Sequence, residues 1–87
     1  MNEIVKIFSE ISDEKDMEKL FNEILTDKER NDIQLRWLLM KEITEGSSQR
    51  DIASKYGISL CKITRGAKIL KNKRSICRKL IKKLIKK

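Results

Sequence analysis

Residues 48–71 read SQRDIASKYGISLCKITRGAKILK, two short amphipathic patterns that meet at Gly57. Counted from Gln49, the fourth, eighth, tenth and fifteenth positions are apolar, as they are where two steeply crossing helices share a small core. These positions hold Ile52, Tyr56, Ile58 and Ile63. Gly57 is the ninth, where the first helix must end in a left-handed conformation that favours glycine. The spacing therefore predicts a helix-turn-helix, with Ala53 as its small fifth residue and Ser59 as the cap of the second helix.

The charge of this stretch indicates a polyanionic partner. It contains six basic residues, and no acidic residue follows Asp51 anywhere in the chain. In a helix-turn-helix the second helix enters the major groove of DNA and the first crosses the backbone. The residues expected to face DNA are Gln49, Arg50, Ala53, Leu60, Cys61, Lys62, Thr64, Lys68 and Lys71. The alternative is an ordinary helical hairpin with a solvated basic face, which the glycine spacing and the charge disfavour.

One position departs from the usual helix-turn-helix pattern. The eighteenth residue is usually bulky and apolar, but here it is Gly66, which follows Arg65. A glycine inside a helix costs ~1 kcal/mol relative to alanine, so we expect the space it leaves to be used. Either a neighbouring helix packs closely against it, or a small flat ligand lies under the helix with Arg65 covering it.

The run SQRDIASKYGIS, followed by ITRG and LK, resembles the bacterial tryptophan (trp operon) repressor family. Upstream, LTDKER and the later Arg36 are similar to a second segment of that family. The resemblance spans Leu25 to Lys71, and ITRG within a helix-turn-helix is fairly specific. It implies an all-α, six-helix fold and an intertwined homodimer, in which the three helices before the motif interlock with those of the partner.

The resemblance also implies a function. Members of the family are transcriptional repressors that bind a palindromic operator in double-stranded DNA, with L-tryptophan as co-repressor. The positions that match the family's ligand site are Arg36, Arg65, Thr26, Gly66, Leu25, Glu23 and Ile69. Arg36 and Arg65 match arginines that sandwich an indole ring, and Gly66 matches the floor of the site. Without the family, Arg36 would suggest only an i,i+4 ion pair with Asp32.

Other positions match the polar end of that ligand site. Thr26 matches a threonine near the ligand carboxylate, and the carbonyls around Glu23 and Leu25 match those near its amino group. Ile69 departs from the family, because well-known members have a small residue there, often a hydroxyl that helps to hold the ligand ammonium. DNA binding is therefore predicted more firmly than tryptophan specificity. The alternatives are another indole or amino acid as ligand, or a ligand-independent regulator of the same fold.

The rest of the chain is predicted to be helical, because proline is absent, glycine is scarce and alternating β-branched runs are missing. One apolar stripe predicts a helix ending near Ser12, and a second predicts a helix through residues 17–24. A T-x-x-E capping box at Thr26 opens a third helix, which runs to about Glu45. This third helix is apolar over a wide arc, so we expect it to be buried against a second subunit. Ser75 is expected to cap a sixth helix.

Length and charge suggest one domain with two electrically different parts. At 87 residues the chain fits a single DNA-binding domain, residues 1–87. Residues 1–45, the expected dimerisation helices, hold seven basic and twelve acidic residues, a net charge of −5. Residues 46–87 hold fourteen basic and one acidic residue, a net charge of +13. This part contains the helix-turn-helix, residues 48–71, and a C-terminal basic helix, residues 75–87. Its charge suits a polyanion such as DNA.

Several classes of function are not expected. There is no signal-peptide pattern and no apolar run of about 18 residues, so the protein is expected to be cytoplasmic and not to span a membrane. The chain has no histidine, and Cys61 and Cys77 lack metal-ligand spacing, so neither a metal site nor another cofactor is expected. No nucleophile and base converge in the sequence, so the protein is not expected to be an enzyme.

The segment SICRKLIKKLIKK, residues 75–87, supports a rival interpretation. It combines one apolar stripe with an opposite basic face, which is the pattern of a cationic helix that lies on an anionic membrane or binds a partner. We prefer a packed helix with a solvated basic face, because the sixth helix of the resembling family closes the dimer core. The stripe comprises Ile76, Cys77, Leu80, Ile81, Leu84 and Ile85.

Overall fold

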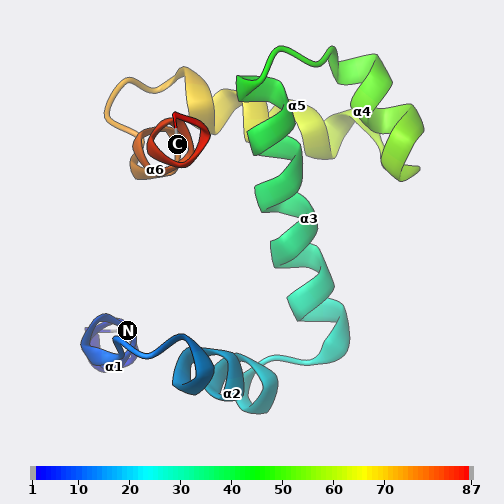
Figure 1. Cartoon of the computed structure of the whole chain (residues 1–87). Helices are drawn as coiled ribbons and strands as arrows, with labels where there is room; N and C mark the ends of the chain where they lie inside the picture. The colour runs from blue at the N-terminus through cyan, green and yellow to red at the C-terminus, as the bar shows by residue number, and fades with distance from the viewer. Residues whose placement is uncertain (1, 87) are drawn as a thin grey trace. The chain divides into compact units, whose positions relative to one another are not determined.

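The computed structural model describes residues 2–86, which form six α-helices joined by short loops (Figure 1). They are α1 (Asn2–Glu10), α2 (Glu14–Ile24), α3 (Asp27–Thr44), α4 (Gln49–Tyr56), α5 (Leu60–Lys71) and α6 (Ile76–Ile85). No strand occurs among the described residues. The prediction of an all-α fold with six helices is confirmed.

The chain divides into two compact units, residues 1–32 and 33–87. The boundary lies inside α3, whereas the sequence suggested grouping residues 1–45. The first unit contains α1 and α2, where the rings of Phe8 and Phe21 meet edge to face with centroids 5.8 Å apart. Such a contact is favourable for two aromatic rings.

The predicted capping box at the start of α3 is confirmed. The Thr26 N–H donates to a carboxylate oxygen of Glu29 at 2.8 Å, and the Glu29 N–H donates to the Thr26 hydroxyl at 3.2 Å. Two N–H groups at the end of the helix, which have no partner within it, are thereby satisfied. The backbone hydrogen bond from Thr26 also holds the pKa of Glu29 below its usual value.

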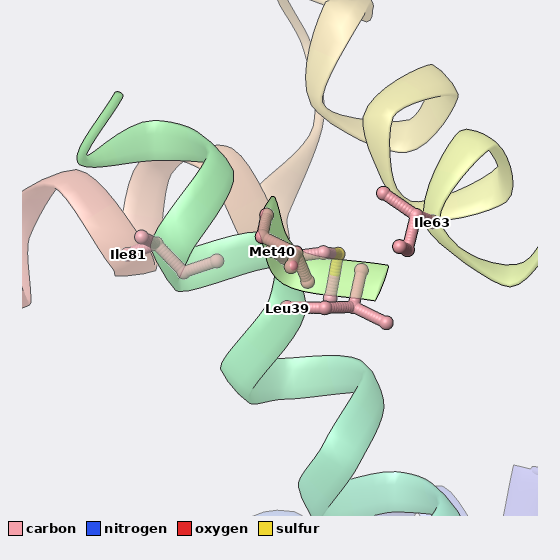
Figure 2. Packing of buried hydrophobic residues seen from close by; sticks show 5 residues of the cluster. Leu39, Met40, Ile63 and Ile81 are labelled. Carbon is pink, nitrogen blue, oxygen red and sulfur yellow. The ribbon is translucent and has the colours of Figure 1, made fainter. Parts of the chain in front are cut away.

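The core of the second unit joins four helices. It consists of Leu39 and Met40 from α3, Ile52 from α4, Ile63 from α5 and Ile81 from α6. Figure 2 shows four of these side chains labelled on α3, α5 and α6. Tyr56, Ile58 and Ala53 pack against this cluster, as the spacing within residues 48–71 predicts. The second half of α3 is therefore part of the body that carries the helix-turn-helix.

The turn between α4 and α5 also follows the prediction. Gly57 has φ 62° and ψ 37°, in the left-handed region, and its N–H donates to the carbonyl of Ala53. Because a side chain at this φ is strained, glycine suits the position.

The helix caps were predicted only in part. Ser75 caps α6, accepting a hydrogen bond from the Arg78 N–H at 3.2 Å. Ser59 stands at the N-cap position of α5, as predicted, but its side chain makes no cap hydrogen bond. Ser48, which the sequence analysis did not single out, caps α4 by accepting from the Asp51 N–H at 3.1 Å.

Gly66 is buried where α5 approaches α3. A Cβ atom at this position would overlap with Cδ1 of Leu39 and lie 3.2 Å from Cγ of Met40. The first of the two expectations for Gly66, close packing of a neighbouring helix, therefore describes the structure.

Two helices of the second unit leave apolar side chains exposed. On α6 the apolar stripe is buried unevenly. Ile81 is fully buried and Cys77 is half-buried, but Ile76 is 69% exposed. On α3, Ile33 and Leu38 are exposed, although Leu39 and Met40 beside them are buried. A single chain thus covers only part of each apolar arc. Among the described residues, no helix is both long and apolar enough to cross a membrane.

Candidate nucleic-acid interface and ligand recess

The helix-turn-helix presents most of the predicted DNA-facing residues to solvent. Exposed residues of this set are Gln49, Arg50, Leu60, Cys61, Lys62, Thr64, Lys68 and Lys71. Ala53 differs from them, because it is half-buried and packs against the core. The apolar sides of α4 and α5 therefore hold the two helices together, and their polar and basic sides are free for an outside partner.

An ion pair that the sequence analysis missed ties α4 to α3. Nζ of Lys55 lies 3.3 Å from a carboxylate oxygen of Glu42, whose side chain is largely buried. The Lys55 ammonium also lies 5.4 Å from the centre of the Tyr56 ring, close enough for a cation–π contact. Because the residues are 13 positions apart, no helical spacing pointed to this pair.

The three side chains shift one another's acidity. The Tyr56 hydroxyl is the main influence that lowers the pKa of Glu42, and the Lys55 ammonium adds to it, although partial burial acts in the opposite direction. Conversely, the Glu42 carboxylate raises the pKa of both Lys55 and Tyr56. These shifts favour the charged forms of Glu42 and Lys55, whose ion pair joins α4 to α3.

Arg36 of α3 and Arg65 of α5 line the same recess, of about 500 Å³. Ile69 lies there too, together with three residues that were not predicted as ligand contacts: Lys68, Asn72 and Ser75. Arg36 and Arg65 are 29 positions apart in the sequence, so only the packing of α5 on α3 brings them together. The recess has three cationic side chains and no acidic one among its lining residues, which favours an anionic group in the ligand.

The other residues predicted for the ligand site are not among the lining residues of this recess. Gly66 is not among the lining residues of the recess, because Leu39 and Met40 cover it. Glu23, Leu25 and Thr26 belong to the first unit, so their role stays a prediction.

The carbonyl and hydroxyl groups of that segment already have partners. The carbonyl of Leu25 accepts a hydrogen bond from the Arg30 guanidinium at 2.6 Å, and the Thr26 hydroxyl accepts one from the Glu29 N–H. A carbonyl oxygen has a second lone pair and a hydroxyl has a proton to donate, so both groups keep capacity for a ligand.

The cysteines and acidic residues suggest no further chemistry. Cys61 is exposed and Cys77 half-buried, and both are free thiols. Among residues 2–86, no three potential metal-ligating side chains lie close enough together to hold an ion.

Comparison with known proteins identifies a matching family and several relatives. The sequence model of a family described as Trp repressor protein matches residues 1–85. A Trp operon repressor homolog of Chlamydia trachomatis serovar D is 41% identical over 64 residues, which are 72% of this chain and 68% of the relative. A Trp operon repressor homolog of Xylella fastidiosa strain M23 is 40% identical over 65 residues, 74% of this chain and 71% of the relative. No solved structure matches the chain significantly.

Proposed function

This chain belongs to the Trp repressor family of DNA-binding transcription regulators, and from that premise we propose that it represses transcription by binding a palindromic operator as a homodimer. The observation that carries the proposal is the helix-turn-helix itself. The core residues Ile52 and Ile63 hold α4 against α5, while the basic and polar side chains of both helices are exposed. In this geometry α5 reads the major groove and the start of α4 meets the phosphates.

Arg50, exposed in the first turn of α4, tests the reading surface directly. Arg50→Ala should weaken binding to the operator in a gel shift at fixed salt, because it removes a cation expected to contact phosphate or a base edge. The matched control is Lys28→Ala, which also removes one exposed positive charge but lies in the acidic part of the chain. If Arg50→Ala binds as tightly as the wild type, the proposed reading surface is wrong.

We further propose that the recess of Arg36 and Arg65 binds the co-repressor, L-tryptophan or a similar indole or amino acid. Its volume of about 500 Å³ is within the usual range for small-ligand sites, roughly 300–1,000 Å³. Guanidinium groups stack on flat aromatic rings and bind carboxylates, so two arginines suit an aromatic acid. The recess lies between α3 and α5, so a bound ligand can change the position of α5 relative to α3. The resulting shift in population between two positions of α5 is limited by the difference in the ligand's affinity for them.

The co-repressor proposal is tested by gel shifts with and without L-tryptophan. Tryptophan should strengthen operator binding by the wild type, and Arg65→Ala should remove this response. Lys71→Ala is the control, because Lys71 lies on the same helix but does not line the recess. If the wild type binds the operator equally well without tryptophan, the co-repressor claim fails and the DNA-binding proposal stands as a ligand-independent one.

A further inference from the structure

A second recess lies at the turn between α5 and α6. Its volume is about 500 Å³, and it is open to solvent. We call it the basic recess, because every lining residue except Ser75 is cationic. The lining residues are Lys73, Arg74, Ser75, Arg78, Lys79 and Lys82. None of these residues is part of the helix-turn-helix or of the proposed co-repressor recess except Ser75, which lines both recesses.

The charges of the basic recess have no internal partner. The ion pairs among residues 2–86 involve Arg30 and Lys55 only, so none of the five cations forms an ion pair with a described residue. No acidic residue follows Asp51, and therefore none flanks the recess in sequence. Five like charges around one concavity repel each other and concentrate anions there.

The recess is fixed to the helix-turn-helix and is not a loose tail. The turn before α6 is held by Asn72, whose side-chain oxygen accepts from the Arg74 N–H at 2.9 Å and whose carbonyl accepts from the Ser75 N–H at 3.0 Å. Ile81, fully buried in the shared core, anchors α6. The basic groups on α6 are therefore carried at a set position relative to α5.

The basic recess shares a lining residue, Ser75, with the recess that Lys68 of α5 lines. Lys68, exposed on α5 and predicted to face DNA, lines the co-repressor recess, and that recess adjoins the basic one at Ser75. The start of α5 and the turn after it are separated by about 18 Å, given 12 residues with a rise of ~1.5 Å each. The recess therefore lies at the opposite end of α5 from Leu60.

We propose that the basic recess binds the phosphate backbone of duplex DNA outside the stretch that α4 and α5 read. The inference rests on the proposed function and adds a second contact surface to it. A solvent-open recess with charges on two elements suits a continuous phosphodiester chain, whereas a small anion is usually enclosed by its site. Phosphate contacts carry no base information, so this surface strengthens binding to every sequence equally.

Two double variants of α6 test the proposal. Lys79→Gln/Lys82→Gln removes two charges of the recess, and Lys83→Gln/Lys86→Gln removes two charges with the same spacing at the C-terminal end of α6, outside the recess. Duplex affinity is measured over a range of salt concentrations, with operator and with unrelated DNA. Each lost phosphate contact reduces the slope of log K against log salt by ~0.9, so we expect the recess variant to lose about 1.8 per bound chain. The control variant should lose clearly less, and both should keep the melting temperature of the wild type.

The outcomes separate this inference from the function on which it rests. If both double variants show the same salt slope, while Arg50→Ala weakens operator binding relative to the wild type, only the proposal for the basic recess is refuted. A wild-type protein that binds no duplex refutes both proposals. Two alternative partners are measured separately: vesicles that contain phosphatidylserine, and inorganic tripolyphosphate. If the binding of either one depends on Lys79 and Lys82 while the binding of duplex DNA does not, the assignment to DNA is wrong.

Discussion

Among single residues, Glu42 shows how charge positions the helix-turn-helix. Its carboxylate contacts Lys55 of α4, and the Tyr56 hydroxyl is the main cause of its lowered pKa. A carboxylate whose pKa is lower in the folded than in the unfolded chain stabilises the fold above the unfolded pKa, ~4.3 for glutamate. This stability is lost as the pH falls through the folded pKa.

Glu42→Gln should therefore lower the free energy of unfolding at pH 7, and its difference from the wild type should begin to shrink below the unfolded pKa, ~4.3, and vanish below the lower folded pKa. Urea unfolding at several pH values measures this difference. Glu45→Gln, an exposed substitution just beyond the end of α3, is the control and should have little effect. A difference that is as large at pH 3 as at pH 7 would mean that the charge of Glu42 does not stabilise the fold.

Gly66 provides a second prediction for a single residue. Gly66→Ala adds a methyl group that overlaps with Leu39, a side chain that is itself buried. Overpacking costs ~1–3 kcal/mol, and replacing a helical glycine by alanine returns ~1 kcal/mol, so we expect a net loss of about 1 kcal/mol. Urea unfolding should show this loss, and a smaller one in the Leu39→Val background, where the neighbour is shorter. A more stable Gly66→Ala protein would show that Leu39 moves aside at no cost.

Single residues also show what the sequence can and cannot predict. The left-handed turn at Gly57 was predictable, because it depends on the backbone of one residue. The contact of Glu42 with Lys55 was not, because it depends on how α3 and α4 pack. For Gly66 the sequence indicated that space was needed, but only the packed helices show that Leu39 and Met40 occupy it.

At the scale of single helices, α4 and α5 differ in how their N-termini are capped. Ser48 caps α4 through the Asp51 N–H, whereas Ser59 makes no such bond at α5. Ser48→Ala should cost about 1 kcal/mol, the usual effect of losing an N-cap side chain, and Ser59→Ala should cost clearly less. Thermal unfolding followed by circular dichroism compares the two variants. Equal losses would show that the cap bond of Ser48 does not contribute to stability.

The helices as elements were predicted well, and their partners were not. Periodicity and caps placed all six, and the largest disagreement at an end is at the start of α2, predicted at residue 17 and found at Glu14. On α6 the sequence indicated one apolar stripe, but the structure buries Ile81 and leaves Ile76 exposed. A stripe shows that a side of the helix is apolar, and it does not show whether its own chain or another molecule covers it.

For the whole molecule, the proposed ligand site shows the same division. Family resemblance named Arg36, Arg65 and Ile69, and the packing of α5 on α3 brings these three residues to one recess. Lys68 was expected to face DNA only, yet it lines that recess with Asn72 and Ser75. Asn72 and Ser75 lie at the turn that leads into α6, and no local sequence signal specifies where such a turn lies relative to α3.

The state of assembly is the last prediction and follows from the exposed part of α3. Ile33, Gln34, Trp37 and Leu38 line an open apolar depression of about 430 Å³. A chain of 87 residues buries too little surface to be very stable alone. We therefore expect the wild type to self-associate through this side of α3, as the proposed homodimer requires, and to melt at a higher temperature as its concentration rises.

Leu38→Lys should prevent this association, because a second subunit would have to bury an unpaired charge. Leu38 is 42% exposed, so the substitution costs the single chain little. Leu60→Lys is the control, since Leu60 is 49% exposed but lies at the start of α5, on the side predicted to face DNA. Sedimentation equilibrium should find Leu60→Lys dimeric and Leu38→Lys monomeric. If the wild type is a monomer, or Leu38→Lys is a dimer, this side of α3 is not where two subunits meet.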